Sequence, residues 1–255
     1  MSMNLDARQR AMLLEMGVRV WQPQAPTAPA AQAVPVAAPE PTAVVLPAQA
    51  KPHGVHTLNW GELQSAVSAC EACGLCQSRQ HTVFGTGSAP ARWLIVGEAP
   101  GEQEDLQGQP FVGPAGQLLD NMLKAVGLSR GSDVFITNVL KCRPPANRNP
   151  QPDEMAQCAP YLQRQIELVQ PTVILALGRF AAQSLLQSSL PEVASIPLGK
   201  LRGQVHCYEN NSKRVSVVVS YHPAYLLRAP ADKAKAWADW CLALATAPHL
   251  AATSD

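Results

Sequence analysis

Apolar residues along the chain gather into short runs that alternate with segments of helical period. Four runs have the length and β-branched content of buried strands, at 93–97, 134–140, 173–178 and 215–222. Elsewhere apolar residues recur every three to four positions, which predicts helices over 115–128, 151–169, 179–188 and 232–247. This alternation indicates an α/β fold, with a three-layer α/β/α sandwich around a central, mainly parallel four-stranded sheet.

The first 56 residues lack this alternation. Residues 1–20 hold a short amphipathic pattern, for which we expect a helix with apolar positions at Leu5, Met12, Leu13 and Met16. From Trp21 to Ala50, 17 of 30 residues are proline or alanine. Because such a segment cannot bury a core, we interpret residues 21–56 as a linker within a disordered N-terminal extension. The helix could dock a replication or repair protein; a weakly structured tail is the alternative.

Length, hydrophobic content and net charge limit the domain organisation and the kinds of partner that we expect. At 255 residues and 47% hydrophobic, the chain can bury a full core, which we place in one domain over residues 57–250. The net charge of +1 provides no overall attraction to nucleic acid, so a DNA partner requires a local patch. No apolar run approaches the roughly 18 residues of a membrane span, and the N-terminus lacks a secretion signal. We therefore expect a cytoplasmic monomer.

Seven cysteines in a reducing compartment favour metal binding over disulfides. Cys70, Cys73 and Cys76 have C-x2-C-x2-C spacing, and Cys142 is separated from Cys158 by 15 residues. Clustered thiols favour an iron–sulfur cluster, with zinc on four of them as the alternative. Cys207 and Cys241 stand apart and are expected to be buried. A basic stretch near the second group is either a phosphate-binding patch or a solvated loop, and it contains Lys141, Arg143 and Arg148.

The loop after the first predicted strand resembles a phosphate loop but has the wrong charge. Residues 96–116 contain five glycines and four acids, Glu98, Glu102, Glu104 and Asp105, without a basic residue. A phosphate needs backbone N–H groups and a lysine or helix N-terminus. The acids instead favour a ligand that develops positive charge. The loop also lacks G-x-G-x-x-G, which speaks against a dinucleotide-binding enzyme.

Several ordered motifs resemble the family 4 uracil-DNA glycosylases, the iron–sulfur branch of the uracil-DNA glycosylase superfamily. They are "CEAC", "VFGTG", "GEAPGEQED", "GQPFVGPAG", "TNVLKCRPPANRNP", "CAPYL", "ALG" and "YHPAYLLR". The resemblance covers residues 66–245 and implies a uracil-DNA glycosylase-like fold for the 57–250 domain. It implies base excision repair, in which the N-glycosidic bond of uracil in single- or double-stranded DNA is hydrolysed to leave an abasic site.

The resemblance implies a role for each site residue. Phe111 would stack on the flipped uracil, and the Asn138 amide would read its N3–H and O4. His222 would face the developing O2 anion. Glu98 would reject the methyl group of thymine, and Glu104 would handle the water, with Asp105 as second choice. Backbone contacts to the base or water would come from Gly97, Glu98, Ala99 and Gly101.

The last motif predicts a DNA wedge. Tyr225, Leu226 and Leu227 would fill the gap left by the flipped base, with Arg143, Arg148 and Arg228 on phosphates. The alternative is a helix start that packs its leucines inward. The resemblance further implies a [4Fe-4S] cluster on Cys70, Cys73, Cys142 and Cys158, with Cys76 as an additional thiol.

Two other functions stay open at the level of sequence. The chain could be a non-catalytic iron–sulfur module that binds DNA in replication or repair. It could also use its carboxylates on sugar glycosides, although the asparagine and the H-P motif would then have no use.

Overall fold

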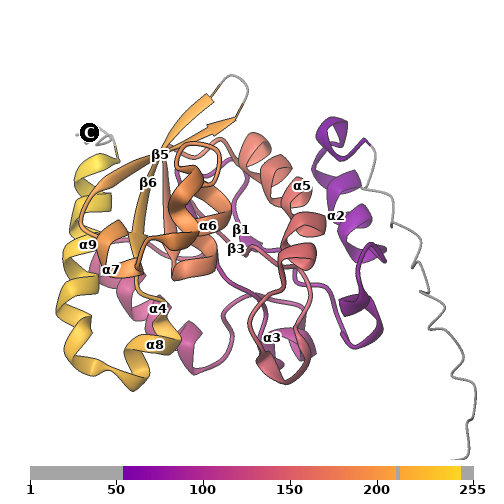
Figure 1. Ribbon diagram of the computed structural model, residues 1–255, viewed down its shortest axis with the longest axis horizontal. Coiled ribbons are helices and arrows are strands. Elements are labelled where there is room, and N and C mark those ends of the chain that lie inside the picture. The colour runs from indigo at the N-terminus through magenta and orange to yellow at the C-terminus, as the bar shows by residue number, and fades with distance from the viewer. Residues whose placement is uncertain (1–53, 211–212, 248–255) are drawn as a thin grey trace, which may run out of the picture. The chain divides into compact units, whose positions relative to one another are not determined.

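Six strands form one mixed sheet at the centre of the computed structural model, which describes residues 54–210 and 213–247 (Figure 1). The strand order is β1-β3-β2-β4-β6-β5. The four inner strands are parallel, and their bounds are β2 Trp93–Gly97, β3 Val134–Asn138, β4 Val173–Leu177 and β6 Lys213–Ser220. The edges are antiparallel strands, β1 Thr86–Gly87 and β5 Val205–Asn210.

The prediction of four strands is corrected to six. The four inner strands coincide closely with the predicted apolar runs, because strands buried on both faces are apolar throughout. The two edge strands carry no such run: β1 has two residues, and in β5 only Tyr208 is buried among exposed and half-buried positions. An edge strand is recruited by pairing with a neighbour, and its own sequence gives little signal.

Helices cover both faces of the sheet. α2 (Trp60–Ser68), α5 (Pro152–Val169) and α6 (Arg179–Leu186) pack on one face, against alternate strand residues such as Val96 and Ile174. α4 (Pro114–Ala125) and α9 (Lys233–Thr246) pack on the other, where Trp93 and Trp240 are buried. In Figure 1 α9 lies to the left of the sheet, and α2 and α5 lie to its right. The alternation of side chains along each strand supplies both faces.

Short elements complete the described chain. They are α3 Glu102–Gln107, α7 Leu198–Leu201, α8 Pro223–Arg228, and the 3-10 turns Val55–Thr57, Gly74–Gln77, Pro145–Asn147, Pro191–Ser195 and Pro230–Asp232. Val55 is already buried in the core, so packing begins slightly before the predicted end of the linker. The helix expected over 1–20 and nearly all of the 21–56 linker lie outside the described residues. No helix among those described has the length and apolarity needed to cross a membrane.

The connections place the informative loops together. Along the chain β2 is followed by β3 on one side, and β4 then returns to the other side of β2. In open α/β sheets, ligands bind beyond the carboxyl ends of strands where the order reverses in this way. The segments that follow β2, β3, β4 and β6 all leave the sheet at this edge.

Candidate active site

The carboxyl edge of the sheet brings segments distant in sequence together. β2 ends at Gly97, which pairs with Asn138 at the end of β3. Gly178 follows β4, and its N–H donates to Ser220 O at the end of β6 over 2.9 Å. A cleft of about 590 Å³ opens here, and its lining includes Glu98, Ala99, Arg179, His222, Tyr225 and Arg228.

Phe111 and Asn138 pack against Gly97 inside the fold. Their side chains are buried, and a Cβ built on Gly97 would lie 2.3 Å from Asn138 Oδ1 and 2.6 Å from Phe111 Cζ. Glycine is therefore required for this close approach. The Phe111 ring also stacks on the His222 imidazole, with centroids 5.5 Å apart and planes at 28°. His222 therefore lines the open cleft and also contacts Phe111, which is buried beside Asn138.

The Asn138 side chain carries an unused acceptor. Its Oδ1 is buried and has no hydrogen-bond partner within the part of the chain that the structure describes. Leaving a buried polar atom unpaired costs about 1–3 kcal/mol. Asn138 itself does not line the cleft, but it packs against Gly97, the neighbour of the cleft residue Glu98, and its Oδ1 is able to accept an N–H group.

Lys141 does not belong to a phosphate-binding patch, which corrects the sequence-based expectation. Its side chain is 2% exposed, and its ammonium donates to Thr137 Oγ1, Asn138 O and Gln165 Oε1 at 2.7–2.8 Å. Burial lowers its pKa to about 7. Because all three N–H groups can be used inside the protein, the ammonium is not free for a phosphate. It instead holds the end of β3 that carries Asn138.

His222 is positioned as a neutral donor. Its Nδ1 accepts a hydrogen bond from Ala224 N at 3.2 Å, at the start of α8. Burial and the nearby Arg228 guanidinium lower the pKa of His222 to about 4, against the opposite effect of Glu104. A neutral ring whose Nδ1 accepts must carry its proton on Nε2. His222 can therefore donate from Nε2 at neutral pH.

The depressed pKa of His222 predicts a pH-dependent stability. The unfolded residue titrates near pH 6.5, and the folded residue titrates at about 4. Between these values the unfolded chain binds more protons, so the free energy of unfolding rises with pH by at most ~1.4 kcal/mol per pH unit. Urea unfolding near pH 4.5 and pH 7 should show wild type losing more stability on acidification than His222→Asn. Equal losses would contradict a folded-state histidine that stays neutral.

The three candidate carboxylates have different surroundings. Glu98 lines the cleft, and burial raises its pKa, against the opposite effect of Arg179. Asp105 is 3% exposed, and its Oδ1 accepts from Gln80 N at 2.9 Å and His81 N at 3.3 Å. Asp105 therefore ties α3 to the segment before β1.

Glu104 closes the loop that carries Phe111. Its Oε1 accepts from Val112 N at 2.9 Å and Gly113 N at 3.1 Å, and its Oε2 accepts from Gly101 N at 3.1 Å. A Cβ on Gly101 would lie 2.7 Å from Glu104 Oε2, so glycine allows this contact. One carboxylate thereby holds both ends of the acidic loop.

We expect Glu104→Gln to lower the free energy of unfolding by about 1.5–3 kcal/mol, because the substitution removes one charge-assisted acceptor. Glu102→Gln is the matched control, since the Glu102 side chain is 64% exposed and lies 3.9 Å from Arg143. Urea midpoints of both variants test the prediction. An unchanged midpoint for Glu104→Gln would rule out a clamping role for this residue.

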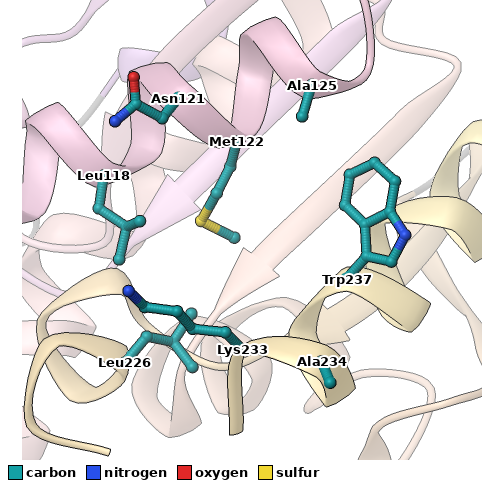
Figure 2. Close-up of a pocket in the computed structure, with 8 residues that line it drawn as sticks. All are labelled: Leu118, Asn121, Met122, Ala125, Leu226, Lys233, Ala234 and Trp237. Atoms are coloured by element: carbon teal, nitrogen blue, oxygen red, sulfur yellow. The ribbon is translucent and has the colours of Figure 1, made fainter. Parts of the chain in front are cut away.

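The residues of the predicted wedge differ in exposure, with Leu226 alone buried. Tyr225 and Leu227 are 37% and 44% exposed, and Arg228 is also exposed, whereas Leu226 is 1% exposed. Figure 2 shows Leu226 beside a separate cavity of about 400 Å³ between α4, α8 and α9, together with Met122 and Trp237. In this conformation Leu226 follows the inward-packing alternative, and Tyr225 and Leu227 face outward.

Two of the three predicted phosphate-binding arginines, Arg143 and Arg148, already have protein partners. Arg143 Nε donates to Asn147 Oδ1 at 2.8 Å. Arg148 forms a two-pronged pair with Glu154, with distances of 3.0 and 2.5 Å. Arg148 is exposed and can therefore reach a phosphate. Because Glu154 already binds its guanidinium, Arg148 must either bind both groups at once or leave Glu154.

The predicted ligand cysteines lie in one region. Cys142 and Cys158 are buried, and Cys70 and Cys73 pack against the same core. Burial raises the pKa of the Cys158 thiol to about 12, with neighbouring Cys142 and Cys73 adding to the shift. Arg79 Nη1 donates to Cys142 Sγ at 3.2 Å. Over residues 54–210 and 213–247, no three or more His, Cys, Asp or Glu side chains are arranged to hold a metal ion.

Sequence reasoning missed several residues at this edge. Arg179, Tyr221, Asn147 and Asn149 line the cleft, and none of them was expected there. Arg179 directly follows the "ALG" motif, so its position after a strand was the available signal. Cys241 was expected to be buried but is exposed on α9.

Comparison with known proteins assigns relatives to this chain. The model of the uracil DNA glycosylase superfamily matches residues 84–241. A type-4 uracil-DNA glycosylase of Archaeoglobus fulgidus is 46% identical over 164 residues, which cover 64% of this chain and 81% of that protein. Those of Saccharolobus solfataricus and Thermotoga maritima are 44% and 43% identical, over 64% of this chain and 75% and 80% of theirs.

Proposed function

The chain belongs to the uracil-DNA glycosylase superfamily and, within it, to the type-4 family, and from this membership we propose how its cleft removes uracil from DNA. It is a uracil-DNA glycosylase of DNA repair, as the motifs predicted. The reaction hydrolyses the N-glycosidic bond of deoxyuridine and leaves an abasic site. A base must leave the helix to enter such a site, at a cost of a few kcal/mol.

The unpaired, buried Oδ1 of Asn138 carries the proposal for base recognition. In our proposal it accepts the N3–H of uracil, while the side-chain amide donates to O4. Cytosine lacks an N3–H and carries a donor at C4, so the same contacts would reject it. The Phe111 ring packs against the same glycine as this amide, Gly97, and its other neighbour is the His222 ring. Phe111 then offers its face to the base.

The departing base carries negative charge on O2, and His222 is our candidate to stabilise it. Its Nε2–H is the free donor, because Nδ1 is engaged by Ala224 N. A neutral donor aimed at a developing anion lowers the barrier without transferring its proton. Because the pKa of His222 is about 4, its contribution should not change between pH 5 and pH 8.

In our proposal the carboxylates of the loop stabilise the positive charge that develops on the sugar. We propose that Glu98, on the cleft wall, lies near the C5 side of uracil and excludes the methyl group of thymine. Glu104 remains our prediction for the residue that handles the water, with Asp105 second, since oxygens that accept from backbone N–H groups retain further lone pairs. Backbone atoms of Gly97, Ala99 and Gly101 complete the wall.

We propose that DNA lies across the outer face of the cleft. Tyr225 and Arg228 line the cleft, and Leu227 is exposed between them in the sequence. Tyr225 and Leu227 would fill the gap in the base stack, with Arg228 on a phosphate. Arg143 and Arg148 would add phosphate contacts, while Leu226 supports the wedge from within.

We propose that Cys70, Cys73, Cys142 and Cys158 hold a [4Fe-4S] cluster, as the family membership suggests. The proposal is supported by an all-thiol donor set, the burial of Cys142 and Cys158, and the Arg79 guanidinium beside Cys142. Zinc on four of these thiols is the alternative. When bound, the cluster would join the segment before the sheet to the loop after β3 through iron–thiolate bonds.

We expect purified protein to contain iron and acid-labile sulfide in equal amounts and to absorb visible light. Cys158→Ser should lose this absorption, whereas Cys241→Ser should retain it because Cys241 is exposed on α9. Cys76→Ser tests the additional thiol in the same measurement. A colourless protein that contains zinc would contradict the cluster.

A strand-cleavage assay tests the proposed function. The substrate is an oligonucleotide with one uracil, its twin carries thymine, a chelator suppresses nucleases, and alkali reveals abasic sites. Cleavage of the uracil strand alone is the expected result. If cluster-loaded protein binds the uracil strand and leaves it intact, the non-catalytic DNA-binding module becomes the better reading.

A further inference from the structure

Phe111 has a backbone conformation that its neighbours must hold in place. Its φ is 55°, in the left-handed region that residues other than glycine rarely adopt. Such a conformation persists only where the surrounding structure imposes it, and it is often found at functional sites. The groups that impose it therefore control where the Phe111 ring lies.

Arg130 binds the backbone on both sides of the 110–111 peptide bond. Its Nη1 donates to Pro110 O at 2.8 Å, and its Nη2 donates to Phe111 O. Asp120 on α4 orients the guanidinium by accepting from Nε at 2.6 Å. Arg130 is far from Phe111 in sequence and lies between α4 and β3, so only the tertiary structure brings the two together.

Two further groups hold the same peptide. A Cβ on Gly116 would lie 1.7 Å from Phe111 O, so only glycine lets α4 approach this carbonyl. Glu104 accepts from the following N–H groups of Val112 and Gly113. Arg130 thus engages the carbonyls and Glu104 engages the amides that flank the strained residue.

We propose that Arg130 is a positioning residue for catalysis, which sets the place of the Phe111 ring and, through their stacking, that of the His222 imidazole. The inference rests on the proposed function, and Arg130 itself does not touch the substrate. A solvent-exposed ion pair normally contributes little. Arg130 differs because its guanidinium bridges two carbonyls at a strained residue, and small displacements of reacting groups have large kinetic effects.

The test compares Arg130→Met with Arg92→Met. Arg92 forms a similar half-exposed pair with Asp133 at 3.1 Å, and among the described residues it donates no hydrogen bond to the Phe111 backbone, so it serves as the matched control. We expect Arg130→Met to lower kcat/KM on uracil-containing DNA about tenfold, with Arg92→Met close to wild type. Asp120→Asn should show a weaker form of the defect, and Arg130→Lys should restore part of the activity by donating to one carbonyl.

A double-mutant cycle separates positioning from general stability. In a Phe111→Ala background, Arg130→Met should have almost no further effect, because the ring it positions is gone. A full tenfold loss in that background, or equal losses for Arg130→Met and Arg92→Met, would overturn the proposal.

A spectroscopic measurement keeps the inference testable without activity. The ring-proton NMR signals of His222, assigned by their absence in His222→Asn, sense the stacked Phe111 ring. They should shift in Arg130→Met and stay in place in Arg92→Met. Unshifted His222 signals in Arg130→Met would overturn the positioning role, whether or not the wild-type protein is active. Failure of the wild-type protein to release uracil would contradict the proposed function instead.

Discussion

Replacing His222 by alanine is expected to lower kcat for uracil release by about 10²–10³-fold, the loss typical of removing one donor to a developing anion. His222 is able to donate to the departing base because its Nδ1 accepts from Ala224 N, which leaves Nε2–H as the donor. Stacking against Phe111 fixes the ring plane. Single-turnover assays with saturating enzyme would isolate this step from product release.

His222 also caps α8, so a stability control is needed. Loss of the acceptor for Ala224 N should cost about 1 kcal/mol of stability. His222→Asn retains a capping acceptor but shortens the side chain, so it should be nearly as stable as wild type and remain strongly impaired in kcat. If the alanine variant keeps kcat within threefold of wild type, His222 does not stabilise the departing base.

Replacing Asn138 by alanine is expected to lower kcat/KM for uracil by at least about 100-fold, because the substitution removes both hydrogen bonds that we propose this side chain makes with uracil. The free energy of unfolding of this variant should not fall with its activity. Since Oδ1 is buried without a partner among the described residues, its removal should leave the urea midpoint unchanged or raise it. A large activity loss without a stability loss is the pattern of a ligand-binding group.

Asn210→Ala is the matched control for Asn138→Ala. Its amide donates to Glu167 at 2.9 Å, and Asn210 pairs with Lys213 at the amino end of β6, opposite the carboxyl edge, so we expect normal activity and slightly reduced stability. Competition by free uracil gives a second measurement, since the Asn138 variant should bind the base more weakly. An Asn138→Ala variant that cleaves the uracil strand at the wild-type rate would contradict base recognition by this residue.

The sequence predicted the inner sheet and its helices well because these elements are buried in a regular way. β2 begins and ends where its apolar run does, and α5 and α9 lie within one residue of the predicted bounds. Strands β1 and β5 were missed because their pairing depends on the neighbouring strand. The family was also readable, since ordered motifs need no coordinates, and the comparisons confirm it.

By itself, then, the sequence determined the family, the parallel sheet and the identity of the loops at its carboxyl edge. The tertiary structure decided which side chains reach the cleft: it buried Lys141 beneath Asn138, turned Leu226 inward and tied Glu104 to backbone N–H groups. It also brought Arg130 to the Phe111 carbonyl. The physical reason is that a motif specifies residue types along the chain, whereas burial and hydrogen bonding depend on atoms supplied by distant segments.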